Sequence, residues 1–139
     1  YKERFEPGVQ SPVDTLKYGS GSCRDFALFM MEAVRSVGLA ARFVSGYVYD
    51  PSIDGEESET IGAGSTHAWA QVYLPGAGWI EFDPTNASIG GHNLVPVAVA
   101  REPAQAMPVS GSFSGSPEDF VDMKVDVTVR SVRLTAGVA

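Results

Sequence analysis

The sequence has little cysteine, no basic run and no long apolar run. Cys23 is the only cysteine among 139 residues, so no internal disulfide can form and folding does not require an oxidising compartment. Lys and Arg number 10 against 17 Asp and Glu, a net charge of −7. That balance argues against nucleic acid or an anionic membrane as a partner. No apolar stretch approaches the roughly 18 residues that span a bilayer.

Length and composition indicate one domain over residues 1–139, because 139 residues can enclose a core of their own. Apolar residues make up 44% and charged residues 19%, an ordinary globular composition. The sequence has no signal-peptide pattern, and we expect a cytoplasmic location. The chain begins at Tyr1 rather than Met, so we expect it to be part of a longer protein. Its oligomeric state is left open.

The order of apolar patterns predicts an α+β domain in which a helix precedes several antiparallel strands. Helical spacing of apolar residues from Arg24 to Val37 indicates a buried helix, and Gly38 is a suitable end for it. A short helical turn is expected over residues 13–18. Strands are expected at residues 41–49, 67–74, 79–83, about 94–100 and 121–134, and loops at 50–66 and 84–118.

Two of these strands form a predicted hairpin around Pro75 to Gly78. A turn centred on Pro75 places His67 opposite Asp83. Opposite residues of an antiparallel pair have Cβ atoms about 5 Å apart, so the carboxylate could bond an imidazole nitrogen. A four-residue turn closed by Leu74 and Trp79 would shift this register, and that alternative stays open.

Cys23 occupies the expected start of the helix. Ser22 followed by Asp25 fits a capping box, which makes Cys23 the first helical residue. The positive end of the helix dipole and the unpaired amides there favour a thiolate, whereas the charge of Asp25 opposes it. The alternative is that Cys23 is a small buried hydrophobe, the commoner fate of a free cysteine.

Cys23, His67 and Asp83 together have the composition of a thiol nucleophile with its base and orienting group. Asp83 would fix the tautomer of His67, whose other nitrogen would take the thiol proton. Trp69 lies two residues after His67 on the same strand face. It would either wall a substrate site or belong to the core. Taken alone, a histidine such as His67 is more often structural, and Asp83 before Pro84 is typical of a solvated turn residue.

Four motifs in order resemble the transglutaminase-like core of microbial proteins: GSCRDFA at residues 21–27, ARFVSGY at 41–47, THAWAQV at 66–72 and WIEFDPTN at 79–86. The resemblance implies a papain-like α+β fold with a central helix packed on an antiparallel sheet. It assigns Cys23 as nucleophile, His67 as base and Asp83 as orienting carboxylate. In longer members a β-rich region precedes this core.

The family implied by these motifs acts through an acyl-thioenzyme, as peptidases, amidases, deamidating enzymes or protein crosslinkers. We expect a peptidase or amidase acting on a peptide or protein, because no feature indicates a lysine-accepting site. A crosslinking transglutaminase and a non-catalytic peptide-binding module remain alternatives. We expect no cofactor or metal. The acidic loop at 50–59 does not match an EF-hand, and no close ligand pair supports zinc at Cys23, His67, Asp83 and His92.

Overall fold

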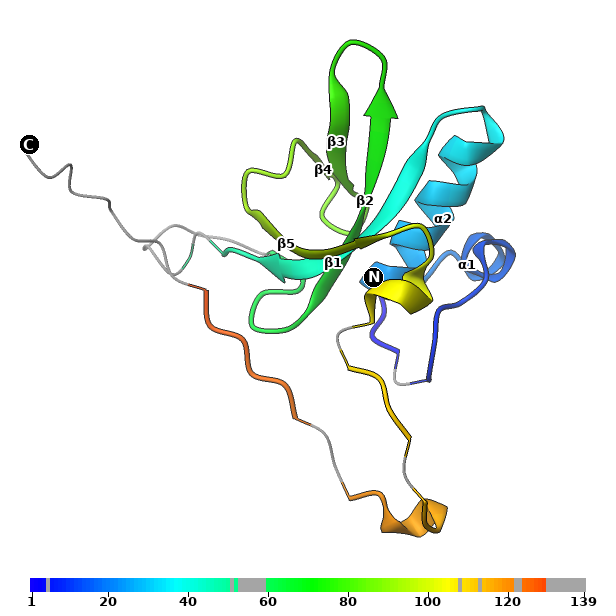
Figure 1. Cartoon of the computed structure of the whole chain (residues 1–139), viewed down its shortest axis with the longest axis vertical. Helices are drawn as coiled ribbons and strands as arrows, with labels where there is room; N and C mark the ends of the chain where they lie inside the picture. Colours follow the sequence, from blue (N-terminus) through cyan, green and yellow to red (C-terminus); the bar gives the residue numbers. More distant parts are fainter. Residues whose placement is uncertain are drawn as a thin grey trace, which may run out of the picture.

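In the part of the chain that the structure describes, two helices and an antiparallel sheet of five strands form the fold (Figure 1). The structure, a computed structural model, describes residues 1–4, 6–50, 52, 60–107, 109–112, 114–121 and 124–129. The strands lie in the order β4-β3-β2-β1-β5. The elements are α1 (Pro12–Tyr18), α2 (Cys23–Ser36), β1 (Ala41–Val48), β2 (His67–Leu74), β3 (Gly78–Asp83), β4 (Ser88–Ile89), β5 (Leu94–Ala100), and the 3-10 turns η2 (Pro103–Ala106) and η3 (Pro117–Asp119). The predicted α+β class and the papain-like arrangement are confirmed.

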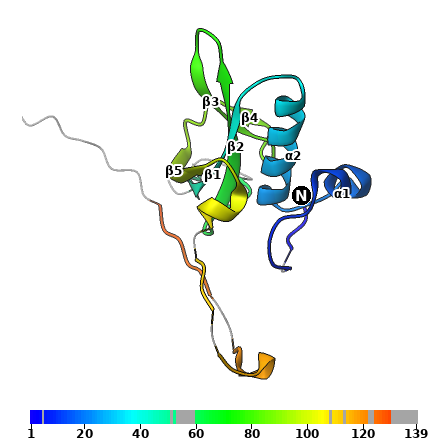
Figure 2. The same cartoon turned by 45° about the vertical axis from the view of Figure 1, so that its right-hand side comes forward.

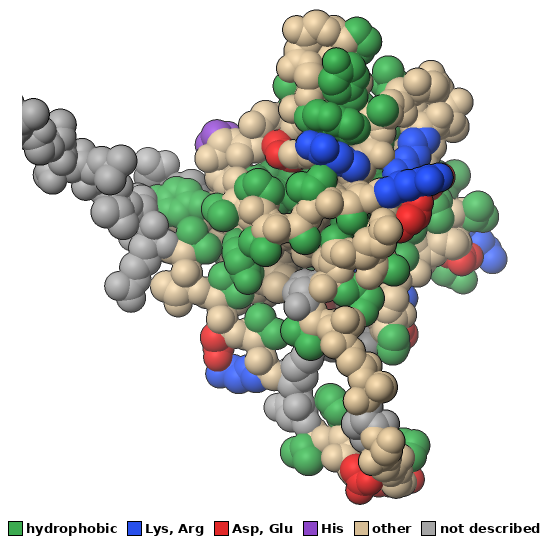
Figure 3. All heavy atoms as spheres, in the orientation of Figure 1, with side chains coloured by type: hydrophobic (Ala, Val, Ile, Leu, Met, Phe, Trp, Pro, Cys, Tyr) green, Lys and Arg blue, Asp and Glu red, His purple; other side chains and the backbone are tan. Residues whose placement is uncertain are grey.

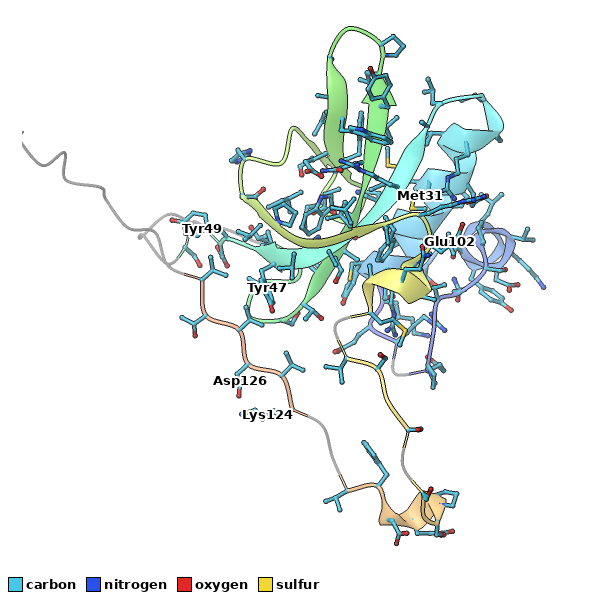
Figure 4. The ribbon with its side chains drawn as sticks, in the orientation of Figure 1. Met31, Tyr47, Tyr49, Glu102, Lys124 and Asp126 are labelled. Atoms are coloured by element: carbon cyan, nitrogen blue, oxygen red, sulfur yellow. The ribbon has the colours of Figure 1, made fainter. Side chains whose placement is uncertain are left out.

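Helix α2 packs on one face of the sheet, against β2 and β1 (Figure 2). Its Ala27 and Met31 are completely buried, and Met31 lies between the helix and the sheet (Figure 4). Ala68 and Ala70 on β2 face them. Small side chains on the strand let the helix approach closely, so α2 and its first residue, Cys23, are held in a fixed position over the sheet.

The opposite face of the sheet has a second, smaller core. Val44, Val48, Trp69 and Leu94 form this cluster. Residues 67 to 72 of β2 are therefore buried on both faces, as the central strand of a sheet should be. Apolar side chains gather over the β2–β3 hairpin and along β5, with basic and acidic side chains between them (Figure 3).

The β2–β3 hairpin is present, but the predicted register is wrong by two residues. Leu74 pairs with Gly78 and Ala70 with Phe82, so the turn is centred on Gly76. Gly76 and Gly78 both adopt left-handed φ angles, 88° and 83°, which close a three-residue turn that side chains would strain. Asp83 is therefore offset from His67 along the strands rather than directly opposite it.

The strand predicted at residues 121–134 is also wrong where it can be judged. Residues 121 and 124–129 form no strand, while 122–123 and 130–134 lie outside the described part of the chain. Val127 donates to the carbonyl of Gly64 at 3.3 Å, and Lys124 pairs with Asp126 at 3.1 Å in solvent (Figure 4). An alternating sequence needs a free strand edge to pair with, and alternation alone does not supply one.

The expected loop at residues 50–66 can be followed only in part. Residues 51 and 53–59, with most of its acidic side chains, lie outside the described residues. Residues 61 to 65 form turns that lead into β2. Among the described helices, none has the length and apolarity that crossing a membrane would require.

Candidate active site

The start of α2 presents Cys23 at the first helical position. Ser22 is the N-cap, with an extended backbone at φ −80° and ψ 174°. Cys23 is partly exposed and is not in a disulfide. The amides of a first helical turn point out of the helix and concentrate positive potential there, so negative charge on the sulfur is favoured.

Asp25 is the anchor of this helix start. Its side chain is 0% exposed and accepts bonds from the amide and the hydroxyl of Ser22, both at 2.8 Å. It also accepts from the amide of Gln10 at 2.7 Å and from Nη1 of Arg4 at 2.8 and 2.9 Å. Burial alone would raise the pKa of the Asp25 carboxyl, but these bonds outweigh burial and hold the pKa below its usual value.

His67 and Asp83 form a buried pair at the strand ends. His67 opens β2 and Asp83 closes β3, and the two side chains are 0% and 1% exposed. Nε2 of His67 lies 2.8 Å from Oδ2 of Asp83. The hydrogen bond expected from the sequence is thus present, although it runs diagonally across the ladder instead of between opposite residues.

The pKa of His67 is raised to about 9. Burial opposes the charged imidazolium, but the hydrogen bond to Asp83, a side-chain interaction with Cys23 and the charges of both partners outweigh burial. Nδ1 of His67 completes no aligned hydrogen bond within the described residues. Catalytic hydrogen bonds are often long or poorly aligned before substrate binds. An unpaired Nδ1 is therefore compatible with a role in accepting the proton of the Cys23 thiol.

Asn86 is a site residue that sequence reasoning did not single out. Its Nδ2 donates to Oδ2 of Asp83 at 2.7 Å, and its own amide and that of Thr85 donate to Oδ1 at 3.3 and 3.0 Å. Its side chain also bonds both the amide and the carbonyl of Ile61, at 2.9 and 3.1 Å. Burial would raise the pKa of the Asp83 carboxyl, but the hydrogen bond and charge of His67, followed by the side-chain and backbone bonds of Asn86, hold that pKa below its usual value.

Gly62 lies directly beside the imidazole. A Cβ atom at this position would come within 2.6 Å of Nδ1 of His67, and the backbone has φ +97°. Both the left-handed backbone and the missing side chain are therefore required for the ring to hold its place. The only sequence signal for this residue was a glycine-rich turn before the histidine.

Trp69 stands behind the imidazole, not at the surface. It is 0% exposed, and its ring is stacked 6.0 Å from that of His67. The indole N–H donates to Glu81, which also accepts from Gln71. In turn, Arg42 donates to Gln71 at 2.6 Å. This chain of bonds fixes the ring that backs His67, and the assignment of Trp69 to substrate binding stays a prediction.

A cleft of about 650 Å³ runs beside the amino end of α2. It is lined by Lys2, Glu3, Arg4, Glu6, Gln10, Tyr18, Ser20 and Gly21. A second cleft, of about 730 Å³, is lined by the distal part of α2, including Glu32 and Arg35. In the part of the chain that the structure describes, no three His, Cys, Asp or Glu side chains are arranged to hold a metal ion.

One known protein family matches the part of the chain that carries the three candidate residues. The model of the transglutaminase-like superfamily matches residues 1–84, a span that includes Cys23, His67 and Asp83. The chain belongs to the transglutaminase-like superfamily. The family resemblance inferred from the four motifs is thus confirmed.

Other transglutaminase-like chains resemble this one over part of their length. An uncharacterized protein of Mycobacterium leprae is 34% identical over 122 residues, which cover 87% of this chain and 42% of that protein. An uncharacterized protein of Mycobacterium tuberculosis is 35% identical over 112 residues, 77% of this chain and 35% of the relative. This chain therefore spans less than half the length of these relatives.

Two further relatives carry names that describe chemistry. A protein-glutamine gamma-glutamyltransferase of Pseudomonas aeruginosa is 32% identical over 66 residues, 48% of this chain and 10% of that enzyme. A crystal structure from Cytophaga hutchinsonii, described as a "Putative Cysteine Protease", has a TM-score of 0.53 and 30% identity over 69% of this chain and 29% of that one. The superfamily match and the Cytophaga hutchinsonii structure support a cysteine protease-like enzyme.

Proposed function

We propose that this chain cleaves amide bonds of a peptide or protein through an acyl-thioenzyme on Cys23. Cys23 is the nucleophile, His67 the general base and acid, and Asp83 the carboxylate that orients the imidazole. The observation that carries the proposal is the buried His67–Asp83 pair at 2.8 Å, with Cys23 beside the imidazole and Nδ1 still unpaired among the described groups.

The first half-reaction forms a thioester. The thiol proton moves to Nδ1 of His67, and the sulfur attacks the amide carbonyl carbon. The negative charge of the tetrahedral oxygen falls near the first amides of α2, which are suited to stabilise it. Collapse breaks the C–N bond, and the imidazolium gives its proton to the departing amine nitrogen.

The second half-reaction restores the thiol. Water attacks the thioester carbonyl while His67 takes a proton from it, and the C–S bond breaks. A carboxylic acid leaves, and the proton on His67 returns to Cys23. Throughout, Asp83 carries no proton itself. It keeps one tautomer and stabilises the imidazolium, as its lowered pKa suits it to do.

Protein crosslinking is the second candidate, and one observation favours it. The Pseudomonas aeruginosa relative is named a protein-glutamine gamma-glutamyltransferase. In that reaction a primary amine replaces water as the acceptor, and every earlier step is the same. The choice between the two therefore depends on what reaches the thioester, rather than on Cys23, His67 and Asp83.

A labelling and product experiment tests the proposal. Iodoacetamide should alkylate Cys23 of this chain faster at neutral pH than it alkylates a cysteine in an unstructured peptide. A glutamine-containing peptide library is then incubated with the protein, with and without an excess of a primary amine, and the products are measured by mass spectrometry. We expect cleavage or ammonia release with little amine incorporation. Cys23→Ala is the matched control and should give neither product.

Each contrary outcome points to a different alternative. Amine incorporation that exceeds hydrolysis would support crosslinking. A thiol that reacts no faster than the free peptide, together with no product, would overturn catalysis and favour a module that binds peptides without turnover. Products that persist in Cys23→Ala would show that Cys23 is not the nucleophile.

A further inference from the structure

Arg4, which precedes α2 in the chain, neutralises the carboxylate of Asp25 at the start of that helix. Arg4 and Asp25 are 21 residues apart, and Nη1 of Arg4 lies 2.8 and 2.9 Å from the two carboxylate oxygens of Asp25. The Arg4 side chain is 17% exposed and that of Asp25 is 0% exposed. A buried carboxylate without a partner is costly, and this ion pair acts together with the bonds from Gln10 and Ser22 to keep Asp25 charged there.

The segment that carries Arg4 is fastened to the same helix start by other bonds. The amide of Lys2 donates to the carbonyl of Gly21 at 2.9 Å, directly before the N-cap. Arg24 reaches back to the carbonyls of Arg4 and Glu6, at 3.5 and 3.2 Å. Arg4 is thus held in one place relative to Cys23 by contacts that do not themselves involve the thiol.

Asp25 bears on Cys23 in two opposing ways. By accepting from Ser22 it fixes the residue that precedes Cys23, which positions the thiol. By its charge, two residues away, it disfavours a thiolate. A cation paired with Asp25 keeps the first effect and cancels the second, so the helix start can be tightly fixed without a net negative charge beside the sulfur.

From this arrangement we propose that Arg4 is a positioning residue for Cys23, acting through Asp25 to hold the helix start and to offset its charge. The inference rests on the proposed function, in which Cys23 reacts as a thiolate. Among the titratable side chains near this helix start, Tyr1 and His67 interact with Cys23 itself. The surrounding charges are those of Glu3, Arg24 and Asp25, which interact with Tyr1, and of Arg4, which pairs with Asp25 and Glu6.

The proposal predicts opposite signs for two substitutions. Arg4→Met leaves the buried carboxylate of Asp25 uncompensated, so the midpoint of the alkylation profile of Cys23 against pH should rise by about one unit. Asp25→Asn removes the negative charge and leaves Arg4 unpaired, so the midpoint should fall. The double variant should have a midpoint close to that of the parent chain. Arg4→Lys keeps the positive charge, so its midpoint should also lie close to that of the parent.

The test measures iodoacetamide alkylation of Cys23 between pH 5 and 10 for the parent and these four variants, with thermal unfolding as the check on folding. Arg101→Met is the matched control, because it removes the same charge from a side chain that is 86% exposed, and it should not move the midpoint. If Arg4→Met does not fold, Asp25→Asn alone still tests the sign, because a fall of the midpoint is expected only if the charge of Asp25 reaches the thiol.

Two results would overturn the role of Arg4. If Arg4→Met and Asp25→Asn shift the midpoint in the same direction, both act only by loosening the helix start. If neither shifts it, the ion pair does not reach the thiol. A failure of the proposed function is separate, because it concerns the parent itself: a parent midpoint equal to that of a free cysteine peptide would contradict catalysis whatever the variants do.

Discussion

The start of α2 and the end of β3 each bury one carboxylate, and the two are held by different partners. Asp25 is bound by a guanidinium, which keeps its proton at any pH at which the chain folds. Asp83 is bound by an imidazole, which can gain and lose a proton and has a pKa of about 9 in the folded chain. Both carboxyl pKa values are lowered. Two carboxylates that are alike in burial and charge therefore have different roles. Asp25 forms an ion pair that does not titrate, and Asp83 forms a pair whose partner can exchange a proton.

The largest expected effect tests the proton-handling side of this comparison. Asp83→Asn should fold, because an amide fits the same space, yet it should lower kcat by roughly 10³–10⁴, since it favours the wrong tautomer of His67. Turnover of the peptide substrate, with thermal unfolding alongside, measures this. Asp119→Asn, at an exposed residue of η3, is the control and should leave turnover unchanged. Wild-type turnover in Asp83→Asn would remove Asp83 from the mechanism.

A second prediction concerns stability against pH. The pKa of His67 is about 9 in the folded chain against a usual value of 6.5. The folded state therefore holds the proton more tightly, and this stabilisation is complete below pH 6.5 and is lost as pH rises to about 9. The loss should be on the order of 3 kcal/mol, since one pKa unit corresponds to about 1.4 kcal/mol.

Urea unfolding at several pH values between 6 and 10 measures that loss. His67→Gln should flatten the dependence over this range, whereas His92→Gln, at an exposed histidine, should leave it as in the parent. The guanidinium of Arg4 does not titrate there, so the other buried pair should add nothing to it. A parent whose stability stays level from pH 6.5 to 9 would contradict the raised pKa of His67.

The smallest expected effect separates Asn86 from the groups that it supports. Asn86→Ala removes the bonds to Asp83 and Ile61, and should cost about 1.5 kcal/mol of stability and about tenfold in kcat. Asn93→Ala removes an asparagine whose side chain bonds the carbonyl of Tyr49 instead, and is the matched control for activity. Equal losses of kcat in the two variants would mean that Asn86 has no particular link to Asp83.

The helix could be predicted because its apolar residues recur at helical spacing, and the strands of the hairpin and β5 because short apolar segments are bounded by turn residues. The hairpin register could not, since it depends on the left-handed φ angles of Gly76 and Gly78, which residue names alone leave open. The prediction of a strand at residues 121–134 was wrong for a related reason, because an alternating sequence does not reveal whether a sheet edge is free to pair with it.

The candidate site likewise contains residues that the sequence predicts and residues that it does not. Cys23, His67 and Asp83 could be proposed from residue type, order and the family motifs. Arg4 and Asn86 were not, because each acts through contacts between segments that no local pattern connects. Asn86 closes the motif that begins at Trp79, yet its bonds to the turn before β2 become visible only in three dimensions.

Gly62 offers a way to sort other sequences of this fold. Any side chain there would occupy the space within 2.6 Å of Nδ1 of His67 and would also strain a backbone at φ +97°. A homologous chain with a larger residue at the aligned position must therefore have moved either its histidine or the preceding turn. Position 62 can thus serve as a screening criterion: chains that keep the Cys, His and Asp but lose this glycine are the first to examine for a surviving fold without the reaction.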